Sequence, residues 1–107
     1  MTDHDALAEA LRSRIGGTTG LTEAGLRLKV AARAAGGPPL IEPFDSLGRQ
    51  IGEAAYRVTD DQVSAVRRAT ASDRAAFEIV MSAAVGAGLR RWDAARRALR
   101  EASDAPP

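Results

Sequence analysis

Cysteine is absent from the 107-residue chain, and its absence excludes several classes of function. Without a thiol the protein cannot form a disulfide, ligate zinc through sulfur or reduce a peroxide through a thiolate. The only histidine, His4, lies in an acidic N-terminal turn between Asp3 and Asp5, and we interpret it as a solvated side chain. One histidine cannot supply a two-histidine metal site, so we expect neither a metal nor another cofactor.

Aromatic residues and long apolar runs are also scarce. Aromatic residues make up 4% of the chain and apolar residues 45%, so the core must consist of Ala, Leu, Val and Ile. No apolar run approaches the ~20 residues that a membrane span needs, and the N-terminus lacks the apolar segment of a signal peptide. We therefore expect a cytoplasmic protein with no membrane partner.

The charge is nearly balanced, with a formal net charge of +1, so no general attraction to nucleic acid is expected. All cations except Lys29 are Arg and Asn is absent, a bias typical of a GC-rich bacterial genome. A basic run near the C-terminus consists of Arg90, Arg91, Arg96, Arg97 and Arg100. Asp93 and Glu101 interrupt this run, so cations that stabilise a helix C-terminus are favoured over a nucleic-acid contact.

Apolar spacing and capping signals predict a single all-α domain over residues 1–107, with four to five helices and one long C-terminal helix. The expected helices run from Asp3 or Asp5 to about Ile15, from the cap Thr22 to about Ala35, from Pro43 to about Tyr56, from the cap Thr59 to about Thr70 and, after the cap Ser72, from Asp73 to about Ala102. Residues 1–20 comprise the first helix and a Gly-rich linker, and residues 103–107 form a frayed tail. Gly36 and Gly37 are expected to end the second helix in a left-handed conformation.

Each expected helix has an apolar stripe that we predict to cover the core. In the first four helices the stripes are Leu7, Leu11 and Ile15, then Leu26, Val30 and Ala34, then Phe44, Leu47, Ile51 and Ala55, and then Val63 and Val66. In the last helix the stripe is Phe77, Val80, Met81, Ala84, Val85, Gly88, Trp92, Ala95 and Leu99. The last helix also has a row of small residues, which we expect in a subunit contact: Ser82, Ala83, Gly86, Ala87 and Gly88.

A polar group on the third expected helix is a candidate catalytic site. Glu53 and Tyr56 are candidates for moving a proton, and Arg49, with Arg33 nearby, is a candidate for binding a substrate carboxylate. The alternative is a surface ion pair between Arg49 and Glu53, one turn apart, beside a half-buried Tyr56. Because any Arg-rich helix produces such pairs, the surface ion pair is favoured.

Glu78, in the first turns of the last expected helix, also has two interpretations. A carboxylate there suits the positive end of the helix dipole, and this interpretation is favoured. The alternative is a buried polar anchor.

Three runs in the second half of the chain carry a family resemblance. They are Val58-Thr59-Asp60-Asp61-Gln62-Val63 with Ala65-Val66-Arg67, then Ser72-Asp73 with Phe77-Glu78-Ile79-Val80, and then Ala83-Ala84-Val85-Gly86 to Leu89-Arg90-Arg91. A capped short helix, a loop and a long helix entered through Phe-Glu-Ile-Val resemble the alkylhydroperoxidase D-like, carboxymuconolactone decarboxylase superfamily. The resemblance covers residues 58–99, about two-fifths of the chain. It implies an all-α fold and a trimer or hexamer built on the long helix.

The resemblance transfers no catalytic residue. Redox-active members of the superfamily have a Glu on one helix, followed by Cys-x-x-Cys and by a His one turn later. In this chain the Glu would fall near Lys29, the Cys pair within residues 41–46 and the His within residues 48–50. None of these positions has the required residue type. We therefore predict a catalytically degenerate member without thiol peroxidase activity, acting as a structural subunit with copies of itself or with a paralogous chain. The alternative is a cofactor-free enzyme, such as a decarboxylase or lyase, or a binding protein for a small carboxylic acid or lactone at the third helix.

Overall fold

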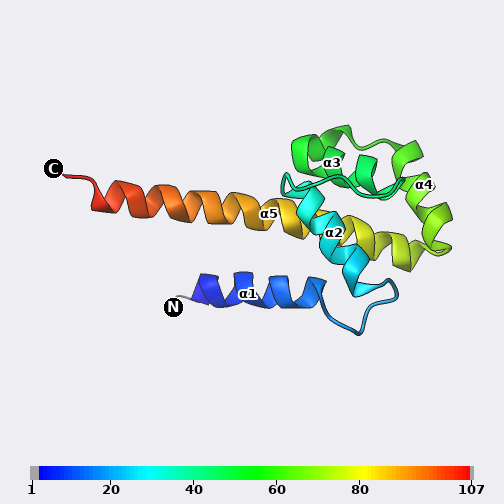
Figure 1. Ribbon diagram of the computed structural model, residues 1–107, viewed down its shortest axis with the longest axis horizontal. Helices are drawn as coiled ribbons and strands as arrows, with labels where there is room; N and C mark the ends of the chain where they lie inside the picture. Colours follow the sequence, from blue (N-terminus) through cyan, green and yellow to red (C-terminus); the bar gives the residue numbers. More distant parts are fainter. Residues whose placement is uncertain (1–2, 107) are drawn as a thin grey trace.

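The computed structural model describes residues 3–106, and within this range every regular element is a helix. The elements are α1 (Asp3–Ile15), α2 (Ala24–Ala34), α3 (Phe44–Ala54), the 3-10 turn η1 (Ala55–Arg57), α4 (Asp60–Thr70) and α5 (Asp73–Asp104). Figure 1 shows α2, α3 and α4 gathered around the N-terminal half of α5, with α1 lying along α5. The predicted all-α fold with a long C-terminal helix is confirmed, and Met1, Thr2 and Pro107 lie outside the described residues.

Side-chain caps start the last two helices as the sequence predicts. Thr59 and Gln62 form a capping box before α4: the Gln62 N–H donates to Thr59 Oγ1 at 3.1 Å, and the Thr59 N–H donates to Gln62 Oε1 at 3.0 Å. Before α5, Ser72 Oγ accepts the Ala75 N–H at 3.1 Å. Gly36, with a φ of +94°, follows α2 in the predicted left-handed conformation.

Three helix boundaries differ from the prediction by two residues. α2 begins at Ala24, without a side-chain cap from Thr22, because the Thr22 hydroxyl donates to Glu78 on α5 at 2.8 Å. α3 ends at Ala54, and the tighter turn η1 occupies the rest of the predicted helix. α5 continues through Asp104, past the predicted end of the helix.

The core is centred on α2, which packs between α3 and α5. Glycines on both partner helices face the α2 backbone. A Cβ atom added at Gly52 on α3 would lie 2.2 Å from Ala34 O, and one added at Gly86 on α5 would lie 2.2 Å from Ala31 O. These distances leave no room for a side chain, so α2 meets both neighbours backbone to backbone. The buried core consists of Val30, Ala34, Phe44, Leu47, Ile51, Val66, Ala76, Ile79, Ala83 and Ala87.

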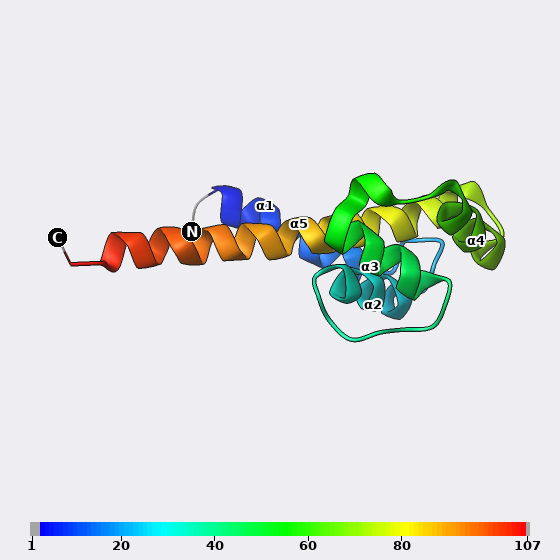
Figure 2. The ribbon, with the colours of Figure 1, turned by 90° about the horizontal axis from the view of Figure 1, so that it is seen from above.

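α5 is longer than the core that it covers. Its 32 residues span about 48 Å at 1.5 Å per residue. Its C-terminal part projects away from α2, α3 and α4 in both views (Figures 1 and 2). α1 runs antiparallel beside it and is held by the ion pairs Arg12–Asp93, at 2.6 Å, and Arg96–Asp5, at 2.8 Å.

The last helix is expected from the sequence to cover the core with its apolar stripe, and this prediction is wrong for most residues of the stripe. Phe77, Met81 and Leu99 are 63%, 43% and 68% exposed. The reason is steric, because α2 approaches α5 so closely at Gly86 that mostly small side chains fit between the helices. The small-residue row predicted for a subunit contact lies mostly inside the chain, since the buried residues of α5 are Ala75, Ala76, Ile79, Ser82, Ala83, Gly86 and Ala87.

On α1 the predicted stripe is confirmed at Ile15 but is wrong at Leu7 and Leu11. Ala8 and Ile15 are buried, whereas Leu7 and Leu11 are 63% and 44% exposed. On α4, Val66 is buried and Val63 is exposed. The predicted stripes of α2 and α3 are confirmed at Val30, Ala34, Phe44, Leu47 and Ile51.

Gly86→Ala is expected to lower the free energy of unfolding by roughly 1–3 kcal/mol, because the new methyl group collides with the Ala31 carbonyl. Gly25→Ala is the matched control. Gly25 also lies in a helix, but a Cβ atom there has no neighbour within 4 Å, so this variant is expected to gain up to about 1 kcal/mol. Urea unfolding measures both changes, and equal stability of the two variants would contradict the backbone contact.

Candidate functional site

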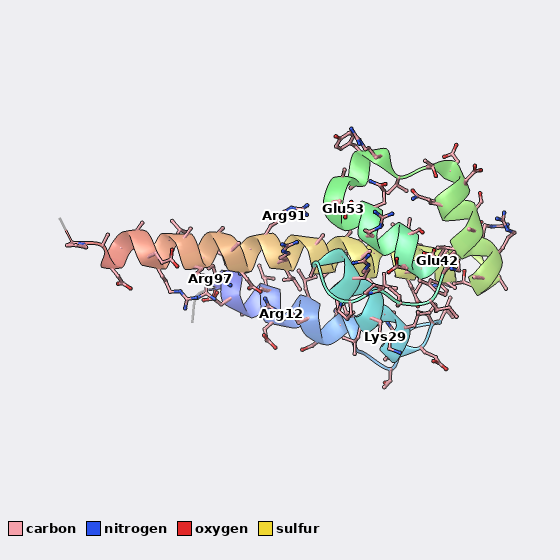
Figure 3. The ribbon with its side chains drawn as sticks, turned by 45° about the horizontal axis from the view of Figure 1, so that its top comes forward. Arg12, Lys29, Glu42, Glu53, Arg91 and Arg97 are labelled. Carbon is pink, nitrogen blue, oxygen red and sulfur yellow. The ribbon has the colours of Figure 1, made fainter. Side chains whose placement is uncertain are left out.

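The polar group predicted on the third helix lies in solvent. Arg49 Nη1 and Glu53 Oε2 are 3.8 Å apart, and the two side chains are 49% and 65% exposed. Tyr56 is 84% exposed, with the Arg57 guanidinium 5.7 Å from its ring centre. Figure 3 shows Glu53 on the surface of α3. This arrangement is that of a surface ion pair and does not enclose a substrate.

Arg33, the other candidate substrate-binding residue, is engaged within the fold. Its Nε donates to Asp45 Oδ1 at 2.7 Å, and its Nη1 donates to Gly37 O at 3.1 Å. Asp45 Oδ1 also accepts the Leu40 N–H at 3.1 Å. That backbone hydrogen bond, with a further contribution from Arg33, holds the pKa of the Asp45 carboxyl below its usual range. Arg33 therefore fixes the loop between α2 and α3.

A buried arginine on α2 organises the loop that follows α1. Arg27 is only 5% exposed, and its Nε donates to Ile15 O at 2.8 Å. Its two terminal nitrogens donate to the carbonyl oxygens of Gly17 and Thr22. A charged group this deeply buried needs such partners, because an unpaired buried charge is strongly destabilising. Arg27 thus donates to the carbonyl of Ile15, the last residue of α1, and to two carbonyls of the loop that follows.

Glu78 on α5 binds the same loop from the other side. It accepts the Leu21 N–H at 2.7 Å, the Thr22 N–H at 2.9 Å and the Thr22 hydroxyl at 2.8 Å. Its Oε1 lies 3.9 Å from Arg27 Nη1. The Leu21 hydrogen bond is the main cause that lowers the pKa of the Glu78 carboxyl, followed by those from Thr22. The carboxylate therefore stays ionised and anchors the loop, which does not suit a general acid.

Sequence reasoning identifies this pair only in part. Arg27 is not identified from the sequence. Its position shows the signal that could have identified it: Ala31 follows it by four residues and Ala34 by seven, so all three lie on the buried side of α2. For Glu78, the hydrogen bonds agree with the alternative interpretation as a polar anchor, although its side chain is 25% exposed and not fully buried. Its carboxylate binds N–H groups of a distant loop rather than those of its own helix.

An apolar surface remains on the side of α5 that faces away from the core. We call the exposed apolar residues on this side the outward stripe: Phe77, Met81, Ala84, Gly88, Ala95 and Leu99. The exposed side chains of Leu7 and Leu11 on α1 lie close to it. Between the two helices is a hollow of about 260 Å³, lined mainly by apolar groups that include Leu7, Leu11 and Gly88. His4 and Trp92 meet edge to face in its wall, with ring centres 6.0 Å apart.

The two neighbouring glycines of α5 differ in what surrounds them. Gly in a helix interior is less favourable than Ala by about 1 kcal/mol. At Gly86 this cost is offset by the close packing against Ala31. At Gly88 a Cβ atom would meet nothing within 4 Å, so no contact among the described residues explains the glycine. Gly88 therefore faces open space on the outside of α5.

The basic run near the C-terminus is partly used in contacts within the chain. Arg96 pairs with Asp5, and Arg91 Nη2 donates to Gly52 O on α3 at 2.9 Å. Figure 3 shows Arg91 on the stretch of α5 that passes α3. Over residues 3–106, no group of His, Cys, Asp and Glu side chains is placed to hold a metal ion. None of the helices in that range has the length and apolar content to cross a bilayer.

Comparisons of the chain with protein-family models, with curated proteins and with solved structures found no match.

Glu78 is expected to make the stability of the fold sensitive to acid. The pKa of Glu78 in the folded state lies below the value of about 4.3 for a Glu in an unfolded chain. The contribution of Glu78 to the free energy of unfolding is therefore complete above about pH 4.3, and it is lost as the pH falls through the lowered pKa. Glu78→Gln should therefore be less stable than wild type near neutral pH and should lose less further stability between about pH 5 and pH 3.

Urea unfolding at each pH measures this difference. Glu53→Gln, which removes only the exposed ion pair with Arg49, is the control and should match wild type within about 0.5 kcal/mol. A Glu78→Gln curve that runs parallel to the wild-type curve across the acidic range would show that Glu78 is not the anchor.

Proposed function

We propose that this protein is a catalytically inactive member of the alkylhydroperoxidase D-like, carboxymuconolactone decarboxylase superfamily and serves as a structural subunit of an oligomer. Its contact surface is the outward stripe of α5 together with Leu7 and Leu11 of α1. The observation that carries the proposal is the exposure of these large apolar side chains along one face. Contiguous apolar surface of this kind, bordered by polar residues, marks protein interaction sites.

The projecting end of α5 supports the same conclusion. From Arg97 to Asp104 every residue is exposed, including Leu99 at 68%. A helical segment without tertiary packing is only marginally stable in water, because most helix stability in proteins comes from burial of an apolar face. A partner that covers Leu99 supplies that burial.

The enzyme alternative has less support. Thiol chemistry is excluded by the lack of cysteine. An acid–base site needs groups that converge in a cavity, whereas Glu53 and Tyr56 are 65% and 84% exposed and Arg49 only pairs with Glu53. Of the two interpretations drawn from the sequence, the structural subunit is therefore the better supported.

Light scattering on the purified protein tests the proposal. The wild type is expected to have a mass that is a multiple of the 11.2 kDa of one chain. The double variant Phe77→Ser, Met81→Ser lacks the largest apolar groups of the outward stripe and should have the mass of one chain.

Tyr56→Ser is the control, because Tyr56 is a large apolar residue that is 84% exposed and lies off this face, on η1. It should leave the mass unchanged. A double variant that keeps the wild-type mass would exclude the outward stripe as the contact surface.

A further inference from the structure

We infer that the partner of the outward stripe is a second copy of this chain, bound antiparallel, with the two α5 helices crossing at Gly88 on a two-fold axis. This inference rests on the proposed function and adds the identity and the orientation of the partner. It draws on the spacing of the stripe, the open position at Gly88 and the charges at the two ends of α1.

The outward stripe is arranged symmetrically about Gly88. Phe77 and Leu99 lie eleven residues before and after it, and Met81 and Ala95 lie seven residues before and after it. In an antiparallel pair, residues at equal distances from the crossing point meet across the two-fold axis. Phe77 of one copy then packs on Leu99 of the other.

The same register brings Met81 against Ala95, so a large side chain faces a small one on either side of the crossing. The contact from Phe77 to Leu99 extends for about 33 Å of helix at 1.5 Å per residue. The projecting C-terminal end of each α5 is thereby placed on the N-terminal half of its partner. In a pair of identical chains, each chain covers the projecting end of the other.

Gly88 stands at the crossing point, where the two backbones come closest. A Cβ atom there would meet nothing within its own chain, so the space above Gly88 is open to the second helix. Ala84, one turn earlier on the same face, is also small. Small residues one turn apart let two helices approach closely, which is the packing reason that Gly88 lacks within one chain.

Charges on α1 fit the same two-fold axis. The middle of α1 is level with Gly88, because His4 meets Trp92 near one end and Leu11 and Arg14 line a hollow with Phe77 at the other end. The axis therefore brings the first turn of one α1, with Asp3, beside Arg14 in the last turn of the partner's α1. Neither Asp3 nor Arg14 has an ion pair within residues 3–106.

The stripe itself is uncharged, so a second copy meets it without repulsion between like charges. A nucleic acid would need cations on this surface, and none of the six stripe residues carries one. A parallel pair would not bring Asp3 of one copy level with Arg14 of the other. The charge pattern thus favours the antiparallel orientation.

Engineered disulfides test the orientation, and the natural absence of cysteine gives a clean background. Gly88→Cys is expected to link two chains on oxidation, because both thiols lie at the axis. Met81→Cys and Ala95→Cys are expected to link when the two variants are mixed, and at least tenfold less when either is oxidised alone. Ala94→Cys, also exposed on α5 but off the stripe, is the control and should not link. Non-reducing gels measure the linked fraction.

Each outcome separates this inference from the proposed function. Links within Met81→Cys alone and within Ala95→Cys alone, with no higher linked fraction in their mixture, would show a parallel pair and overturn the inference. A wild type that is monomeric alone but joins a paralogous chain would also overturn it, while leaving the structural-subunit proposal intact. An assembly of three chains would also overturn the inference and leave the structural-subunit proposal intact, because a ring of three has no two-fold axis. A monomer under every condition would overturn both.

Discussion

The close packing of α2 between α3 and α5 is the constraint on which the rest of the structure depends. At Gly52 and Gly86 the neighbouring helices touch the α2 backbone, so the space between the helices admits few large side chains. This explains how a chain with 4% aromatic residues builds a core from Ala, Val, Leu and Ile with the addition of Phe44. Dispersion contacts in such a core are gained through proximity rather than through the size of the side chains.

That constraint also determines which apolar groups remain outside. Because α5 presents its small residues to α2, the larger Phe77 and Met81 must face the opposite way. Arg27 and Glu78 then fix the loop that carries α1 alongside α5, with Leu7 and Leu11 exposed on the same side. The fold of one chain therefore creates an apolar face that it cannot cover, and a subunit contact is the consequence that we propose.

Local features of the fold could be predicted from the sequence, and features set by distant segments could not. The caps at Thr59 and Ser72 depend on residues within one turn, and both were correctly predicted. α5 is apolar on two faces, so periodicity reveals both but cannot show which one meets α2. The role of Arg27 depends on loop carbonyls brought to it by the fold. The exposed positions of Glu53 and Tyr56 could likewise be settled only in three dimensions.

Amide hydrogen exchange along α5, followed by mass spectrometry over a range of protein concentrations, tests the central claim most directly. If a partner covers the outward stripe, the amides around Leu99 should be protected at high concentration and should lose that protection on dilution. The amides of α2, which is buried within one chain, should not respond. Exchange around Leu99 that is fast at every concentration would contradict the account, because the end of α5 would then have no partner.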